Sequence, residues 1–152
     1  KRTAMLVDPI KDLEAGPAKG SIQQVLKGFT EGWNEHNANI FSGVFVEDAD
    51  CTNVMGDSFR GRTAIEEKHK PLFKTIWSNS TLTTIKTNIR FIKPDVAAVD
   101  ACWKLEELKT SDGNECPPRN ELLNFTMTKY NKGWRIAVMH NMDLPASKIQ
   151  NC

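Results

Sequence analysis

The chain has 152 residues, of which 39% are hydrophobic and 26% charged, which is the composition of an ordinary globular domain. Twenty basic and nineteen acidic side chains leave a net charge of +1, which argues against a nucleic-acid module and against binding to anionic lipid. No apolar run approaches the roughly 20 residues that a membrane span needs, so we expect no membrane-spanning helix.

The N-terminal part of the sequence predicts a tail followed by two helices. Residues 1–20 contain two prolines and two glycines, which indicate a flexible tail. Ser21 with Gln24 has the signature of a capping box and predicts the start of a helix. The apolar stripe of this helix consists of Ile22, Val25, Leu26, Phe29 and Trp33. A second, short helix is expected over residues 40–45.

A short strand and a third helix are expected next. Residues 49–55 have the pattern of a strand, and Gly56-Asp57 has that of a turn. Thr63 with Glu66 forms a second capping-box signature, and Pro71 is expected to kink or split the helix that follows. The apolar face of this helix contains Ile65, His69, Leu72, Phe73 and Ile76.

After residue 79 the hydrophobic period changes from 3.6 to 2, which predicts four long strands. Residues 93–95 and 131–133 read as hairpin turns, and residues 110–120 read as a loop. Three helices that precede an antiparallel meander indicate an α+β fold rather than alternating βαβ units. A curved sheet of this kind often leaves a hollow under its helices.

The four cysteines are Cys51, Cys102, Cys116 and Cys152, and no two of them have C-x-x-C spacing. We therefore expect free structural thiols, with a single Cys102–Cys116 bridge as the alternative. We expect no metal site, because the three histidines form no i, i+4 pair, and no cofactor. Because the sequence begins at Lys1, both a cytoplasmic location and export after removal of a signal peptide remain open.

Several short motifs resemble the nuclear-transport-factor-2-like superfamily, and within it the SnoaL-like group and its SgcJ/EcaC relatives. The motifs are Trp33-Asn34, Phe45 with Asp48, Gly56, Gly61-Arg62 and Gly133-Trp134-Arg135-Ile136. The resemblance covers residues 20–142 and implies a cone-shaped, cystatin-like roll with three helices packed on a curved, mainly antiparallel sheet. It also implies a pocket at the open end of the cone and a homodimer packed through the sheet. The expected division is an N-terminal tail over 1–20, one SnoaL-like domain over 21–145 and a C-terminal tail over 146–152.

The steroid-isomerase branch of that superfamily gives a specific chemical test. An alignment on Gly56 puts Asn53 where that branch has its catalytic aspartate, and an amide cannot act as a base near neutral pH. The same alignment puts Phe29 at the position of the oxyanion-hole tyrosine, and a looser one puts Thr126 at the position of a protonated aspartate. The resemblance therefore argues against steroid-isomerase chemistry in this chain.

His69 and His140 are the candidate acid–base residues, with Asp48 or Asp50 as possible orienting carboxylates. His69 lies on an apolar helix stripe, where a histidine is more often a core residue. His140 has the same even spacing as Trp134, Ile136 and Val138, which predicts that it faces inward.

The leading hypothesis is a protein that binds a small, largely apolar molecule. The expected ligand-binding residues are Phe29, Trp33, Asn53, His69, Phe73, Trp103 and His140. The alternatives are an isomerase- or cyclase-type enzyme and a dimeric adaptor that uses its outer sheet face. We expect that outer face to include Asp100, Cys102, Lys104, Asn124 and Thr126.

Overall fold

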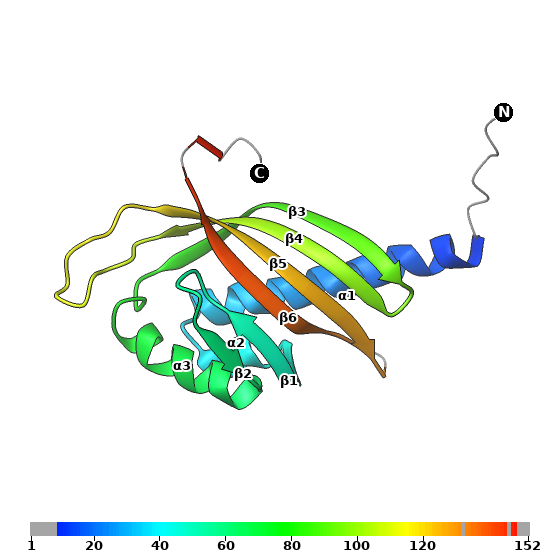
Figure 1. Ribbon diagram of the computed structural model, residues 1–152, viewed down its shortest axis with the longest axis horizontal. Helices are drawn as coiled ribbons and strands as arrows, with labels where there is room; N and C mark the ends of the chain where they lie inside the picture. The colour runs from blue at the N-terminus through cyan, green and yellow to red at the C-terminus, as the bar shows by residue number, and fades with distance from the viewer. Residues whose placement is uncertain (1–8, 132, 146, 149–152) are drawn as a thin grey trace.

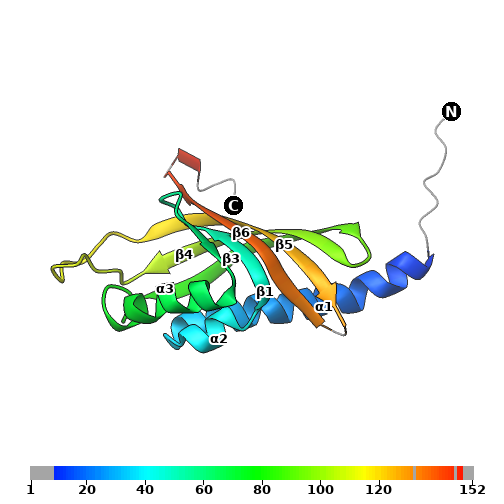
Figure 2. The same ribbon diagram turned by 60° about the horizontal axis from the view of Figure 1, so that its bottom comes forward.

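The computed structural model describes residues 9–131, 133–145 and 147–148, with side chains from residue 16 onward. Residues 1–8 of the predicted N-terminal tail, and residues 146 and 149–152 of the predicted C-terminal tail, lie outside the described residues. The described chain forms a six-stranded sheet in the order β2-β1-β6-β5-β4-β3, and all three helices lie against one face of the curved sheet (Figure 1, Figure 2). The predicted α+β architecture of helices on a curved sheet is confirmed.

Helix α1 spans Pro9–Asn34 and therefore starts well before Ser21, so the predicted start of this helix is wrong. A proline is well tolerated in the first helical turn, because its missing N–H has no partner there in any case. Ser21 and Gln24 lie inside the helix and do not form a capping box. Ala18 already packs against the core, whereas Gly20 has no described atom within 4 Å of the position of a Cβ.

Helix α2 spans only Ala38–Ser42, and strand β1 spans Phe45–Thr52. Asn37 caps α2, since its Oδ1 accepts hydrogen bonds from the backbone N–H groups of Asn39 and Ile40. The predicted helix over residues 40–45 is thus displaced along the chain, because α2 begins already at Ala38 and Phe45 opens strand β1. Its ring is fully buried and contacts those of Phe29 and Phe41.

Strand β2 spans Ser58–Arg60, and helix α3 spans Arg62–Lys74. The predicted capping box at Thr63 is wrong, because Gly61 is the N-cap, at φ 90°, and no side chain of the described residues caps the helix there. Arg62 fixes this corner by donating from Nε and Nη2 to the carbonyl oxygen of Phe45 at 2.9 and 2.6 Å. Pro71 lies inside α3 and does not split it.

The four long strands that the period-2 pattern predicts are confirmed. They are β3 (Thr81–Lys93), β4 (Val96–Glu106), β5 (Arg119–Tyr130) and β6 (Gly133–Leu144). These four strands pair antiparallel in chain order, and β1 pairs with β6 in parallel. Among the described helices, none is long and apolar enough to cross a membrane.

A β-bulge in β6 changes which side chains face the helices. Thr126 pairs with Val138, but its neighbour Met127 pairs with Ile136, so one extra residue is inserted in β6. Ile136 is fully buried, and after the bulge the buried residue is Met139 rather than Val138. The sequence pattern contains no mark of this change, which reverses the facing of every later residue in the strand.

The cysteine prediction is wrong for one residue. Cys51 and Cys116 are free, as expected, but Cys102 is disulfide-bonded. The alternative bridge between Cys102 and Cys116 is therefore also wrong.

Candidate functional site

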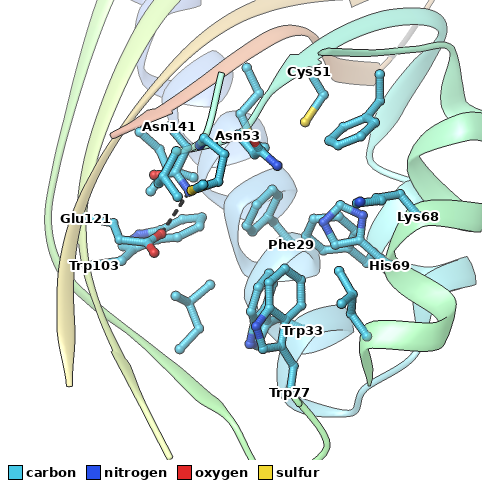
Figure 3. A pocket seen from close by; sticks show the side chains of 18 of the residues that line it. Phe29, Trp33, Cys51, Asn53, Lys68, His69, Trp77, Trp103, Glu121 and Asn141 are labelled. Carbon is cyan, nitrogen blue, oxygen red and sulfur yellow. Dashed lines mark hydrogen bonds between the residues drawn. The ribbon is translucent and has the colours of Figure 1, made fainter. Parts of the chain in front are cut away.

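A cavity of about 300 Å³ lies between the helices and the inner face of the sheet (Figure 3). Helix α1 contributes Phe29 and Trp33, and α3 with the turn after it contributes Lys68, His69, Leu72, Ile76 and Trp77. The sheet contributes Cys51, Trp103, Arg119, Glu121, Leu123, Met139 and Asn141. This volume is at the lower end of the range for small-molecule pockets.

Aromatic rings form much of the cavity wall. The Trp33 ring centroid lies 4.6 Å from that of Trp77, and the Phe29 centroid lies 4.6 Å from that of Trp103. These rings come from helix α1, the turn after α3 and strand β4, and they contact each other at tilted angles. The cavity can therefore accommodate a flat apolar group.

A polar cluster occupies the sheet side of the cavity. Glu121 is 3% exposed and accepts hydrogen bonds from Arg119 Nη2 at 2.9 Å and from Asn141 Nδ2 at 2.8 Å. Burial raises the pKa of Glu121, while the bonds from Asn141 and Arg119 oppose this rise. Arg119 Nε also lies 3.7 Å from Asp143 Oδ1. The cluster thus places a buried carboxylate, held at both oxygens, in the cavity wall.

His69 lies on the opposite wall of the cavity, on α3 (Figure 3). Its Nδ1 is 2.7 Å from the carbonyl oxygen of Ile65, which can only accept, so Nδ1 carries the proton and Nε2 is an acceptor. Burial lowers the pKa of His69 to about 4. The ring is therefore neutral at pH 7, and it is a weak base.

The turn after β1 borders the cavity. Asn53 Oδ1 accepts hydrogen bonds from the backbone N–H groups of Met55 and Asp57, at 3.0 and 2.9 Å. Gly56, at φ 81°, supplies the left-handed residue that this turn needs. Asn53 therefore lines the cavity while its carbonyl oxygen holds the backbone of the turn. Lys68 and Phe59 also line the cavity, and Lys68 Nζ lies 5.4 Å from the centroid of the Phe59 ring.

The structure brings most of the predicted ligand-binding residues together. Phe29, Trp33, Asn53, His69 and Trp103 line the cavity. Phe73 is not among the lining residues; its ring packs in the cluster with those of His69 and Trp77. Cys51 also lines the cavity, and burial raises the pKa of its thiol to about 12, so the thiol is neutral.

The prediction that His140 faces inward is wrong. His140 lies after the β6 bulge, is exposed, and stands opposite Asn124 on the outer face of the sheet. The proposed carboxylate partners of a catalytic histidine are wrong as well. Ala49 and Cys51 are the inward residues of β1, so Asp48 and Asp50 point away from the cavity, and Asp50 lies 3.6 Å from Arg60.

The sequence reasoning missed the polar cluster. Glu121 has the same even spacing as Leu123 and Phe125, so extending that pattern by one step would have placed it inward. Asn141 faces inward only because of the bulge in β6, and no local pattern predicts it. Trp77 follows α3 in a turn that closes over the cavity, where helical periodicity no longer applies.

No family model matches the sequence, and no curated protein matches it. Solved structures with a cystatin-like fold do match. An uncharacterised protein with this fold from Caulobacter vibrioides superposes with a TM-score of 0.80 at 24% identity, over 89% of this chain and 95% of the other. A scytalone dehydratase candidate from Novosphingobium aromaticivorans gives a TM-score of 0.74 at 14% identity, over 91% and 89% of the two chains.

A third structure is a hexachlorocyclohexane dehydrochlorinase, LinA-type3, from Novosphingobium barchaimii. Its TM-score is 0.79 at 11% identity, over 88% of this chain and 91% of the other. These likenesses define a cystatin-like α+β fold for this chain. At such identities they concern the fold alone, because one fold hosts many activities.

Proposed function

We propose that this protein binds a small, flat, largely apolar molecule in the cavity between its helices and sheet, as a member of the SnoaL-like group. The cavity itself carries the proposal: about 300 Å³ with aromatic walls and a few convergent polar groups. A domain whose only task was to present an outer surface would have no use for such a hollow, since unfilled core volume costs stability. The cavity therefore favours ligand binding over the adaptor alternative.

An enzyme of the isomerase or cyclase kind is the second candidate. His69 supports it, because Nδ1 is engaged with Ile65 and leaves Nε2 as an acceptor. A pKa of about 4, however, makes this ring a poor general base at neutral pH, since the best catalytic bases have pKa values near the working pH. The acceptor suits ligand recognition better than proton abstraction.

The experiment compares two substitutions of isoleucine by tryptophan. Ile76→Trp places a large side chain at the cavity, whereas Ile85→Trp places the same side chain on β3 at a position that is 48% exposed. Binding of 2-methoxynaphthalene is measured by calorimetry for the wild-type protein and both variants. We expect Ile76→Trp to weaken binding at least tenfold and Ile85→Trp to leave it unchanged. Equal affinity in all three proteins would place the ligand elsewhere and contradict the proposal.

A further inference from the structure

Trp103 and Glu121 stand directly opposite each other on β4 and β5, on the inner face of the sheet. Both line the cavity, and Trp103 is 1% exposed. Its indole Nε1 is buried and has no hydrogen-bond partner among the described residues. Figure 3 shows the two side chains on the same wall, across the cavity from His69.

This wall offers a donor next to an acceptor. Indole Nε1 can only donate. A buried donor without a partner has lost its hydrogen bonds to water and gained none in the protein, which lowers stability. Glu121 accepts one bond at each oxygen, from Arg119 and Asn141, but a carboxylate offers about four lone-pair positions. Glu121 therefore retains capacity for about two more donors. Asn141 Oδ1 and Arg119 Nε are also buried without a hydrogen-bond partner in the described chain, so the wall holds one further acceptor and one further donor.

The charges around this wall narrow the choice of ligand group. Arg119 lies against Glu121, and its Nε lies 3.7 Å from Asp143, which stands opposite Glu121 on β6, so the cluster carries two carboxylates for one guanidinium. Lys68 is across the cavity, with its ammonium group over Phe59. An anionic ligand group that accepted from Trp103 would lie beside the carboxylate of Glu121 and be repelled by it. A carbonyl group could accept from Trp103, but it has no hydrogen to donate to Glu121.

We propose that the cavity recognises a neutral aromatic hydroxyl group of the phenol or naphthol type, whose oxygen accepts from Trp103 Nε1 and whose hydrogen is donated to Glu121. This inference rests on the proposed function and specifies its ligand class. A hydroxyl group is both donor and acceptor, so it satisfies both members of the pair. The ring that carries it packs against the aromatic wall that Phe29, Trp33 and Trp77 form.

The first test needs only the wild-type protein and three probes of the same ring system. 2-Naphthol can donate and accept, 2-methoxynaphthalene can only accept, and 2-naphthoate is an anion. We expect 2-naphthol to bind about tenfold more tightly than 2-methoxynaphthalene, because hydrogen bonds to charged groups are the stronger ones, and 2-naphthoate to bind most weakly.

The second test uses Glu121→Gln, with Glu106→Gln as the matched control. The control makes the same chemical change on β4 at a residue outside the cavity lining, where the Glu106 side chain is 41% exposed. In Glu121→Gln we expect the affinity for 2-naphthol to fall about tenfold and the affinity for 2-methoxynaphthalene to change less than twofold. Glu106→Gln should bind both probes as the wild-type protein does.

A third variant, Trp103→Phe, removes the donor that both neutral probes use. We expect it to lower the affinities for 2-naphthol and for 2-methoxynaphthalene by a similar factor, whereas Glu121→Gln should lower mainly the affinity for 2-naphthol. Calorimetry gives the affinities, and thermal melting shows whether each variant is folded. If a variant does not fold, the wild-type probe series still decides the matter.

The outcomes separate this inference from the proposed function. Equal affinities for 2-naphthol and 2-methoxynaphthalene would overturn the hydroxyl preference and leave ligand binding intact, and so would a preference for 2-naphthoate. Failure of all three probes to bind would overturn the proposed function and this inference with it.

Discussion

His69 and Glu121 are buried titratable side chains on opposite walls of one cavity, and burial favours the neutral form of each. The consequences for stability have opposite signs. The lowered pKa of His69 makes protonation unfavourable in the folded state, so stability is lost as the pH falls. The raised pKa of Glu121 makes stability fall as the pH rises through its titration.

The contribution of His69 to the pH dependence of stability can be isolated by replacing His69 with phenylalanine, which has a similar shape and suits the surrounding rings. Between pH 6.5 and about 4 the unfolded chain binds more protons at this residue than the folded protein does. We therefore expect the free energy of unfolding of the wild-type protein to fall by up to about 3 kcal/mol more than that of His69→Phe across this window. Urea denaturation at several pH values measures the difference.

The control is His140→Gln, which removes an exposed histidine from the outer sheet face and keeps a polar side chain there. It should keep the wild-type pH profile. Because all three proteins contain Glu121, the opposite contribution of that residue cancels in the comparison. Parallel profiles for the wild-type protein and His69→Phe would show that the buried ring does not titrate as we infer.

At the scale of the elements, the contact between α1 and α2 depends on Gly32. A Cβ at this position would lie 2.5 Å from the backbone nitrogen of Phe41 and 2.6 Å from its Cα. These atoms belong to the backbone of α2 and cannot turn aside as a side chain can. The missing side chain therefore sets the distance between the two helices, and with it the position of the Phe41 ring under the cavity.

Gly32→Ala and Gly20→Ala make the same change in the same helix and should have opposite effects. We expect Gly32→Ala to lower the free energy of unfolding by about 3 kcal/mol, because α2 must move away. At Gly20 no described atom lies within 4 Å of the position of a new Cβ. Gly20→Ala should therefore raise the free energy of unfolding by about 0.5–1 kcal/mol, which is the difference in helix propensity. Chemical denaturation measures both. Equal effects would contradict the close approach of the two helices.

Helix α1 also permits a graded truncation. A chain that starts at Gly16 retains Ala18 and Ile22, both of which pack against the core, whereas a chain that starts at Gln23 lacks them. We expect the first truncation to change the Tm by only a few degrees and the second to lower it by about 5–20 °C, since burying an isoleucine contributes about 2–5 kcal/mol. Loss of cooperative melting in the first truncation would show that residues 1–15 stabilise the domain.

At the scale of the whole molecule, the outer face of the sheet is the surface through which we propose that two copies pair. This face is polar: Asn124 donates a hydrogen bond to Asp100 across β4 and β5, and His140 stands opposite Asn124 on β6. The helices cover the other face of the sheet (Figure 2), and on this face Cys102 is already buried and disulfide-bonded, so we propose that a partner contacts the part around Asn124 and Thr126.

We expect the protein to sediment as a dimer at tens of micromolar. Thr126→Arg, near the middle of the outer face, should shift the equilibrium towards monomer, because a partner copy would bring a second guanidinium against the first. Gln24→Arg makes the same change of charge at an exposed position on α1, on the helix side of the sheet, and should leave the dimer intact. A wild-type protein that sediments only as monomer would remove the proposed interface.

The sequence by itself determined the architecture, because hydrophobic periodicity is a local property that each helix and strand carries in its own residues. It placed Phe29, Trp33 and His69 on apolar helix stripes, and these residues meet in the cavity. It did not determine where α1 begins, because the glycines and prolines of residues 9–20 read as helix breakers although the helix contains them.

Beyond the predicted Asn53 and His69, the tertiary structure decided which polar groups meet in the cavity. One inserted residue in β6 turns Asn141 inward and His140 outward, and strand pairing places Glu121 beside Trp103 and Asn141. Asp48 and Asp50 lie near the site in the sequence, yet they face away from the cavity because of the alternation of β1. Register and pairing are relations between distant segments, so no pattern within a single strand determines them.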